Sequence, residues 1–178
     1  MENHYKGLNI LVFSVFILLW TAAIYAKPVT EDQLKAAFLY NFAHFVTFPE
    51  QQRKHPFRFC IFGNSLFQQA LQLTIADQLI KGNPAELIQL GHQDIQNSCQ
   101  IIYFPESEKN HYKKILSVIK DKPTLTVSSI EGFSKQGGMI EFSRSDNKIK
   151  LIINNDNVKA SGLSIKANLL NIATIVGN

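Results

Sequence analysis

The sequence predicts a three-layer α/β domain with a mainly parallel sheet that ends in an antiparallel hairpin and with helices on both faces. Apolar strand-like runs alternate with helix-like segments between residues 57 and 127, which is typical of parallel strands joined by crossover helices. Two further runs, 140–143 and 148–153, flank the common turn pair Asp146-Asn147 and predict the hairpin. A capped helical segment precedes the first of these strands. We expect one domain over residues 27–178.

The first predicted helix begins at a capping box and runs to about Val46. Thr30 is the N-cap and Gln33 follows three residues later, so each side chain can bond the other's backbone N–H. A stripe of aromatic residues is usually core, but an exposed one would bind a partner. Asn41 within the stripe is expected to bond a neighbouring backbone group. The expected stripe consists of Leu34, Phe38, Asn41, Phe42 and Phe45, with Leu39 and Val46 outside it.

The middle of the chain supplies the parallel part of the sheet. Right-handed crossovers are expected to place the two middle helices on one face of the sheet and the first and last helices on the other. Ser107 is the expected N-cap of the second middle helix. The predicted elements are strand 57–62, helix 66–79, strand 86–90, strand 99–104 and helix 108–120.

The stretch 124–142 organises the remainder of the fold. A buried strand leads through a polar turn to Gly137 and Gly138, a pair that indicates a backbone corner. The stretch either simply connects two strands, or its exposed side around Ser128 and Phe133 is a pocket or docking loop. A phosphate site is not predicted, because the glycine pair precedes a strand and not a helix.

The C-terminal segment is predicted to end the domain with a helix. A short helical piece at 158–160 is broken by Gly162, and Ser164 then caps the last helix. Its expected buried side consists of Leu169, Leu170, Ile172, Ala173 and Val176.

Residues 1–26 resemble a secretory signal peptide. A short polar start is followed by an almost continuously apolar run over 8–20 and by small residues that end at Ala26, the expected cleavage point. The alternative is an uncleaved membrane anchor, and both interpretations export the domain. The formal net charge is +4, without an arginine-rich stripe or an interleaved basic and aromatic patch, so nucleic-acid binding is not predicted.

Export favours a disulfide between Cys60 and Cys99, the only two cysteines. Two buried free thiols are the alternative. Their spacing fits neither a CxxC redox motif nor a zinc knuckle.

The sequence lacks the common catalytic motifs. It has no GxSxG elbow, HExxH pair or P-loop. Glu106 and Glu108 are interpreted as charge compensation at a helix N-terminus. We therefore expect no enzyme, no metal and no cofactor. The histidines of the exported part stand alone in their segments, at positions His44, His55, His92 and His111.

Several blocks together resemble the YfiR-like family of exported bacterial proteins. These are Lys35 to Ala43 with Phe45-Val46 and Phe48-Pro49, Phe57 to Gly63, Cys99 to Tyr103, Leu125 to Ser128, Gly132-Phe133, Gly137 to Ile140 with Phe142, and Gly162-Leu163 with Leu169-Leu170.

The resemblance implies a small periplasmic α/β regulator without catalysis. The best-understood type represses an inner-membrane diguanylate cyclase by binding its periplasmic region, and an outer-membrane lipoprotein can sequester the repressor and raise cyclic-di-GMP. The positions of Cys60 and Cys99 match a family disulfide that supports folding. Some members have a second disulfide, but this sequence lacks the cysteines that would form it, which argues against a redox-sensing role.

Two hypotheses for function follow. The first is the periplasmic repressor, which we also expect to be able to pair with a second copy of itself. The alternative is a periplasmic small-molecule-binding sensor, with its ligand near Ser128, Phe133 and Gly138. The candidate partner or ligand contacts are Asn41, Phe42, Ser128, Phe133, Gly137 and Gly138.

Overall fold

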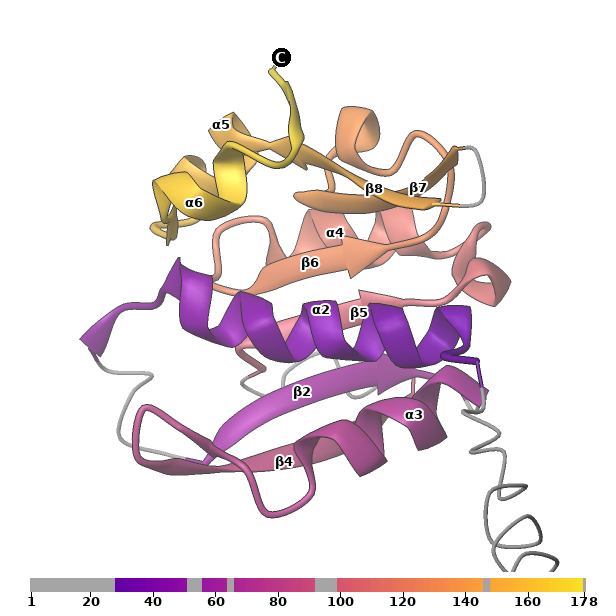
Figure 1. Ribbon diagram of the computed structural model, residues 1–178. Helices are drawn as coiled ribbons and strands as arrows, with labels where there is room; N and C mark the ends of the chain where they lie inside the picture. Colours follow the sequence, from indigo (N-terminus) through magenta and orange to yellow (C-terminus); the bar gives the residue numbers. More distant parts are fainter. Residues whose placement is uncertain (1–27, 51–55, 64–65, 92–98, 146–147, 178) are drawn as a thin grey trace, which may run out of the picture.

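The computed structural model describes residues 28–50, 56–63, 66–91, 99–145 and 148–177 (Figure 1). Their largest element is a sheet of eight strands: β2 (Phe57–Phe62), β3 (Leu79–Ile80), β4 (Asn83–Leu90), β5 (Ile101–Phe104), β6 (Leu125–Ser128), β7 (Ile140–Ser145), β8 (Lys148–Asn154) and β10 (Thr174–Val176). The order across the sheet is β10-β8-β7-β6-β5-β2-β4-β3. The pairs β3–β4 and β7–β8 are antiparallel and the other five pairs are parallel. The mixed, mainly parallel α/β class is therefore confirmed, including the hairpin.

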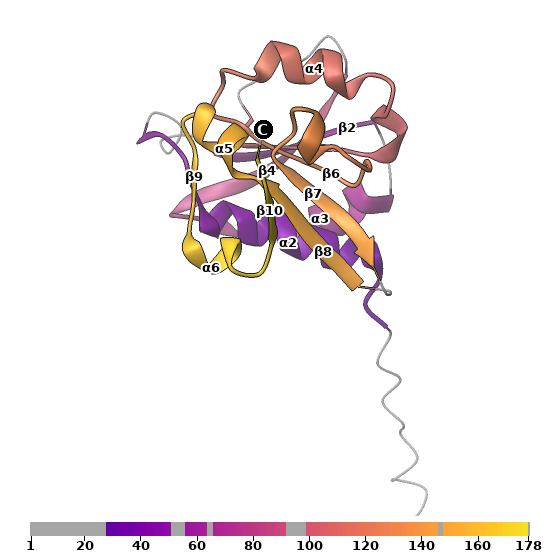
Figure 2. The same cartoon turned by 90° about the horizontal axis from the view of Figure 1, so that it is seen from above.

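Helices cover both faces of this sheet, as Figure 2 shows. The helices are α2 (Glu31–Phe45), α3 (Leu66–Ile75), α4 (Tyr112–Ile119), α5 (Asn155–Ala160) and α6 (Ala167–Leu170), with 3-10 turns η2 (Glu106–Glu108) and η3 (Ser134–Gln136). A second, two-stranded antiparallel sheet joins β1 (Val46–Thr47) to β9 (Ser164–Ile165). None of the helices in the described ranges is long and apolar enough to span a bilayer.

The two middle helices lie on opposite faces, so their predicted placement on one face was wrong. Phe67 and Leu71 of α3 share a core with α2, whereas Ile115 of α4 packs with Phe62 and Phe104 beneath the other face. The reason is the direction across the sheet in which the chain moves from one strand to the next. The chain steps from β2 to β4 in one direction and from β5 to β6 in the other, and two right-handed crossovers of opposite direction put their helices on opposite faces.

Helix α2 has the predicted capping box but a different buried face. The Thr30 hydroxyl accepts from the Gln33 N–H at 3.2 Å, and the Gln33 side chain accepts from the Thr30 N–H at 2.9 Å. Asn41 and Leu34, both expected inside, are exposed. Helix α3 packs along one flank of α2, and Phe142 of β7 packs along the other. The buried side of the helix is therefore rotated away from the expected stripe and toward Leu39, which lies outside that stripe. The fully buried residues of the helix are Ala36, Leu39, Phe42 and Ala43.

The predicted C-terminal helix was wrong. Ser164 begins the short strand β9 instead of capping a helix, and α6 is a single turn. The β-branched residues that follow it form β10, which pairs in parallel with β8 at the sheet edge. Ile172, expected inside, is exposed. The free edge of β8 offers backbone hydrogen-bond partners to residues 174–176, so they form a strand. The helical spacing of apolar residues in the sequence cannot predict a partner that lies so far away in the chain.

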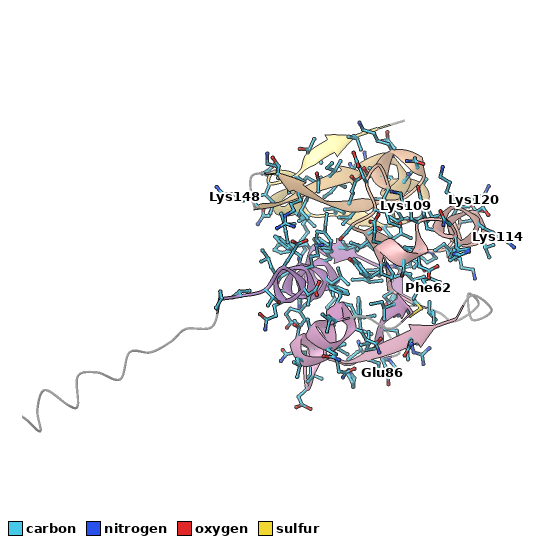
Figure 3. The ribbon with its side chains drawn as sticks, turned by 90° about the vertical axis from the view of Figure 1, so that its right-hand side faces the viewer. Phe62, Glu86, Lys109, Lys114, Lys120 and Lys148 are labelled. Atoms are coloured by element: carbon cyan, nitrogen blue, oxygen red, sulfur yellow. A yellow bond between two sulfur atoms is a disulfide. The ribbon has the colours of Figure 1, made fainter. Side chains whose placement is uncertain are left out.

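Helix α4 also begins later than predicted. Residues 105–111 form two successive turns, in which the N–H groups of Glu108 and His111 donate to the carbonyls of Pro105 and Glu108, so Ser107 is not an N-cap. Helix α3 ends at Ile75 instead of residue 79, because the chain turns through Asp77 (φ 58°) into the β3–β4 hairpin. Lys109, Lys114 and Lys120 lie around α4 on the outer side of the molecule (Figure 3).

Some predictions concern residues outside the described ranges. These are the signal peptide over residues 1–26, the hairpin turn Asp146-Asn147, and His55 and His92. They stay predictions.

Candidate functional site

The loop between β6 and β7, residues 129–139, is built around one buried carboxylate. Glu141 of β7 is only 4% exposed. Its Oε1 accepts from the Gly132 N–H at 3.1 Å, and its Oε2 accepts from the N–H and the hydroxyl of Ser134 at 3.1 and 2.9 Å. Three donors thus replace the water that a charged carboxylate loses on burial.

Two asparagines fasten the same loop to the end of β8. Asn154 Nδ2 donates to the Ser134 carbonyl at 3.0 Å, and its Oδ1 accepts from the Asn157 N–H at 3.0 Å. Asn157 Nδ2 in turn donates to the Gly138 carbonyl at 3.0 Å. A network of polar side chains from β7, β8 and α5 therefore holds the loop.

The glycine pair has a packing reason. Gly137 has φ 101°, in the left-handed region that favours glycine. A Cβ at Gly138 would lie 2.1 Å from Cε1 of Phe133, whose ring packs on Phe104 and Tyr112 with centroids 5.6 and 5.4 Å apart. The pair lets the backbone pass directly over a buried ring.

The six predicted contact residues are not brought together. Phe42, Ser128 and Phe133 are fully buried, so none of them can touch a partner directly in this conformation. The Ser128 hydroxyl is already used, because it donates to the Phe104 carbonyl at 2.8 Å and accepts from the Ile130 N–H at 2.9 Å. Gly138 is buried as well, whereas Asn41 and Gly137 are exposed. Asn41 lies on α2 and Gly137 faces Leu116 of α4, on the other side of the sheet.

A polar cleft lies between the N-terminal turn of α2 and strand β7. It has a volume of about 400 Å³, and we call it the β7 cleft. Glu31 bridges two cations at its rim, Lys35 at 2.7 Å and Arg144 at 3.3 Å. The hydrogen bond from Lys35, and secondarily the charges of Lys35 and Arg144, hold the pKa of Glu31 below its ordinary value against the opposing effect of burial. The lining residues are Glu31, Lys35, Ser129, Glu131, Glu141, Phe142, Ser143, Arg144 and Ile149.

Sequence reasoning missed the β7 cleft. Glu31 and Arg144 are far apart in the sequence, so no local pattern brings them together. The one local signal was the polar residue Ser128 at the end of a buried strand, next to Ser129 of the cleft, since loops at strand ends often carry function.

Tyr103 lies beneath this region with its hydroxyl 3.0 Å from the Ser129 hydroxyl. Burial raises its pKa to about 12, although the Ser129 hydrogen bond acts in the opposite direction.

We expect Tyr103 to make the protein less stable in alkali. Its neutral form is favoured in the folded state, so its contribution is fully present below the ordinary tyrosine pKa of about 10 and is lost as the pH rises toward 12. The loss should be about 2–3 kcal/mol, from about 1.4 kcal/mol for each pKa unit. Urea unfolding between pH 9 and 12 measures it. Tyr103→Phe should flatten this part of the curve, whereas Tyr40→Phe, which also removes a hydroxyl hydrogen bond, should not. Equal slopes in Tyr103→Phe and the wild type would contradict the assignment.

The outer face of α2 is the second candidate surface. We define it by Leu34, Ala37, Asn41 and His44, which lie on the side turned away from the sheet and are exposed or half-buried. Between Lys35 and the end of the helix the only titratable groups are Tyr40 and His44. Burial, followed by the charges of Lys81 and Lys166, holds the pKa of His44 below its ordinary value, which favours a neutral imidazole. Helix α3, which packs beside α2, has no charged residue, and its Leu66 and Leu73 are 74% and 78% exposed.

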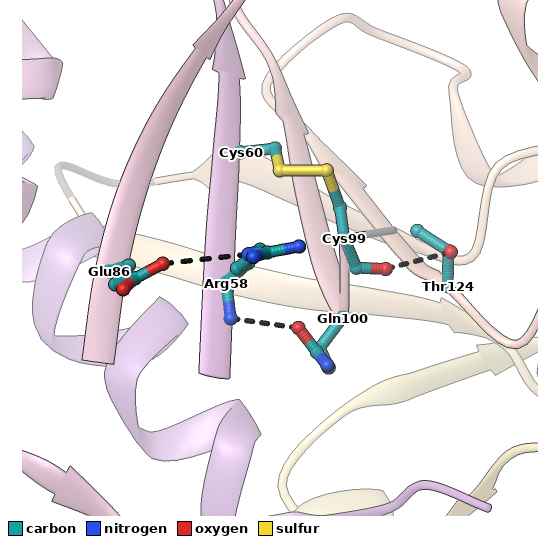
Figure 4. The surroundings of a disulfide bond; sticks show 6 residues. All are labelled: Arg58, Cys60, Glu86, Cys99, Gln100 and Thr124. Atoms are coloured by element: carbon teal, nitrogen blue, oxygen red, sulfur yellow. Dashed lines mark hydrogen bonds and ion pairs between the residues drawn. A yellow bond between two sulfur atoms is a disulfide. The ribbon is translucent and has the colours of Figure 1, made fainter. Parts of the chain in front are cut away.

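The disulfide lies at the neighbouring inner strands β2 and β5 of the sheet (Figure 4). Cys60 of β2 and Cys99, just before β5, are bonded and buried with Cα atoms 6.0 Å apart, so the alternative of two free thiols was wrong. The Cys99 carbonyl accepts from the Thr124 hydroxyl at 2.9 Å. The neighbouring Gln100 side chain accepts from the Arg58 N–H at 2.8 Å. The bond thus ties β2, β5 and the start of β6 together.

The described residues offer no metal centre, since no three His, Cys, Asp or Glu side chains among them are grouped to hold an ion. What they define is a disulfide-linked three-layer α/β domain with a polar cleft and a helix, α2, whose residues 36–45 include no Asp, Glu, Lys or Arg.

The sequence model of the YfiR/HmsC-like family matches residues 32–174, which span the fold from α2 to the first residue of β10. The chain belongs to the YfiR/HmsC-like family. No curated protein matches it. The family is regulatory rather than catalytic, and membership suggests a periplasmic regulator of diguanylate cyclase signalling.

Proposed function

We propose that this protein binds the periplasmic region of an inner-membrane diguanylate cyclase and represses it. The observation that carries the proposal is the family match over almost the whole fold. The outer face of α2 supports it physically. Asn41 is exposed there, and residues 36–45 of the helix carry no carboxylate, ammonium or guanidinium group, so a partner that covers this part of the helix desolvates no such charge of α2.

Repression requires only differential binding. A regulator that prefers the inactive state of the cyclase by about 1–3 kcal/mol shifts its equilibrium about 5- to 150-fold. No group on the regulator needs to react, and a rigid, disulfide-linked scaffold loses little conformational entropy when it docks.

Titration calorimetry against the periplasmic region of a diguanylate cyclase from the same organism tests the proposal. We expect saturable one-to-one binding, weakened at least tenfold by Ala37→Glu and by Asn41→Arg, which place charge in the middle of the α2 outer face. Ser117→Arg is the control, because Ser117 is exposed on α4 across the sheet. The absence of binding to any cyclase of that organism would refute the repressor. If both α2 variants bind the cyclase as tightly as the wild type does, the α2 outer face is not the binding surface, although the protein still binds the cyclase.

The resemblance implies one further partner, an outer-membrane lipoprotein, and pairing with a second copy of the chain is a separate expectation. Analytical ultracentrifugation of the free protein, before each titration, measures whether it is a monomer or a homodimer. Competition between the lipoprotein and the cyclase for one surface would support sequestration.

A small-molecule sensor is the second candidate, and the β7 cleft favours it. The cleft is lined by Lys35 and Arg144 and by the exposed carboxylates of Glu31 and Glu131, so it offers both signs of charge to a small polar metabolite. Thermal-shift screening of polar metabolites tests this, with Arg144→Ala as the cleft variant and Lys150→Ala as the control. A ligand that raises the melting temperature of the control but not of Arg144→Ala supports the sensor. A flat response, or an equal response of both variants, contradicts it.

A further inference from the structure

The segment from η2 through the end of α4 concentrates positive charge. Residues 106–122 hold five lysines and three acids and so carry a net charge of +2, half of the chain's formal +4. Lys109 is paired with Glu106 at 3.7 Å. The others, Lys113, Lys114, Lys120 and Lys122, are exposed and form no ion pair with the described part of the chain.

The geometry of α4 turns these charges to one side. Tyr112, Ile115, Leu116 and Ile119 are spaced at helical intervals and are buried against the sheet. The lysines of the helix therefore lie on its outer half, and Figure 3 shows Lys114 and Lys120 on the outer side of the molecule. Val118 lies among them and is 54% exposed. We call these five lysines and Val118 the α4 lysine face.

We infer that the α4 lysine face docks on an anionic phospholipid surface. Flexible ammonium groups suit a diffuse layer of phosphates, whereas recognition of a defined carboxylate favours the planar fork of arginine. The face has no arginine and no exposed aromatic residue, and lysine is depleted from protein–protein interfaces. Lysine stems also let the charges reach the headgroups while Val118 approaches the interface. These features favour a bilayer over an acidic protein.

Docking of this kind is compatible with the proposed partner surface. Helix α4 and helix α2 lie on opposite faces of the sheet, so a protein lying on its α4 lysine face would keep the α2 outer face accessible. The inference uses the proposed function only to place the protein beside a membrane, and its test contains no cyclase.

Co-sedimentation with vesicles tests the inference. The protein is isolated from the bacterial envelope with whatever N-terminus it carries there, and mixed with phosphatidylcholine vesicles or with 3:1 phosphatidylcholine–phosphatidylglycerol vesicles. We expect binding to the anionic vesicles at 20 mM salt, and at least tenfold weaker binding at 300 mM salt or to neutral vesicles.

Matched charge reversals locate the surface. The triple variant Lys113→Glu, Lys114→Glu, Lys120→Glu should lose binding to anionic vesicles by at least tenfold. The triple variant Lys148→Glu, Lys150→Glu, Lys166→Glu changes the net charge equally at sites away from α4 and should bind at least fivefold better than the first. Urea unfolding of both variants checks that each is folded, and Lys114→Gln with Lys120→Gln replaces the first if it is not. Equal losses in the two triples, binding to neutral vesicles as strong as to anionic ones, or no vesicle binding at low salt would overturn the inference.

Discussion

Loss of the Cys60–Cys99 disulfide should lower the free energy of unfolding by about 4 kcal/mol. The bond joins residues 39 apart, and closing a loop of that length restricts the unfolded chain by about this amount in the chain-entropy model. For a domain of this size the loss corresponds to a fall in melting temperature of about 8–16 °C. The double variant Cys60→Ala, Cys99→Ala measures it by urea unfolding, alongside the wild type with and without reductant.

The topology explains why this bond is placed where it is. The chain leaves β2, builds α3, β3 and β4 on one side, and must return past β2 to begin β5. The disulfide joins the two ends of this segment, Cys60 in β2 and Cys99 just before β5. Reductant should destabilise the wild type and leave the double variant unchanged. If reduced and oxidised wild type unfold at the same urea concentration while two thiols become reactive, the bond contributes nothing.

Glu141→Gln should cost about 3 kcal/mol of stability. The carboxylate accepts from two backbone N–H groups and one hydroxyl. In the glutamine variant the side-chain NH₂ group replaces one of the two oxygens, so it faces the N–H of Gly132 or the N–H and hydroxyl of Ser134 and cannot accept from them. Charged hydrogen bonds contribute about 1.5–3 kcal/mol, and a buried donor left unpaired costs about 1–3 kcal/mol. Equilibrium unfolding in urea at neutral pH gives the value.

Glu131→Gln is the matched control for this substitution. Glu131 lies in the same loop, and it is exposed, so its replacement should change stability by no more than about 0.5 kcal/mol. Two variants of equal stability would show that the Glu141 network does not hold the loop. Hydrogen exchange at Gly132 and Ser134 should accelerate in Glu141→Gln only, because these amides lose their acceptor.

The local features of the fold were predictable from sequence. The Thr30 capping box, the strand at Phe57–Phe62 and the β7–β8 hairpin depend on nearest neighbours and short-range periodicity, and the structure contains all three. The pairing of Cys60 with Cys99 was also predictable, because only two cysteines exist in a chain expected to be exported.

The errors share a different origin. Thr174–Val176 became a strand because the edge of β8 offered backbone partners, and Asn41 turned outward because α3 and Phe142 occupy the two flanks of α2. The β7 cleft joins Glu31 to Arg144 for the same reason. None of these neighbours is close in sequence, so periodicity could not reveal them.

The sequence alone determined the fold class, the family and the disulfide, because composition, caps and apolar periodicity act locally and the family blocks stand in linear order. Only the tertiary structure decided which helix covers which face and which residues reach the surface. The direction of each step between strands sets the face of its helix, and that direction is a property of the assembled sheet. The same assembly buried Ser128 and Phe133 and left Asn41 exposed.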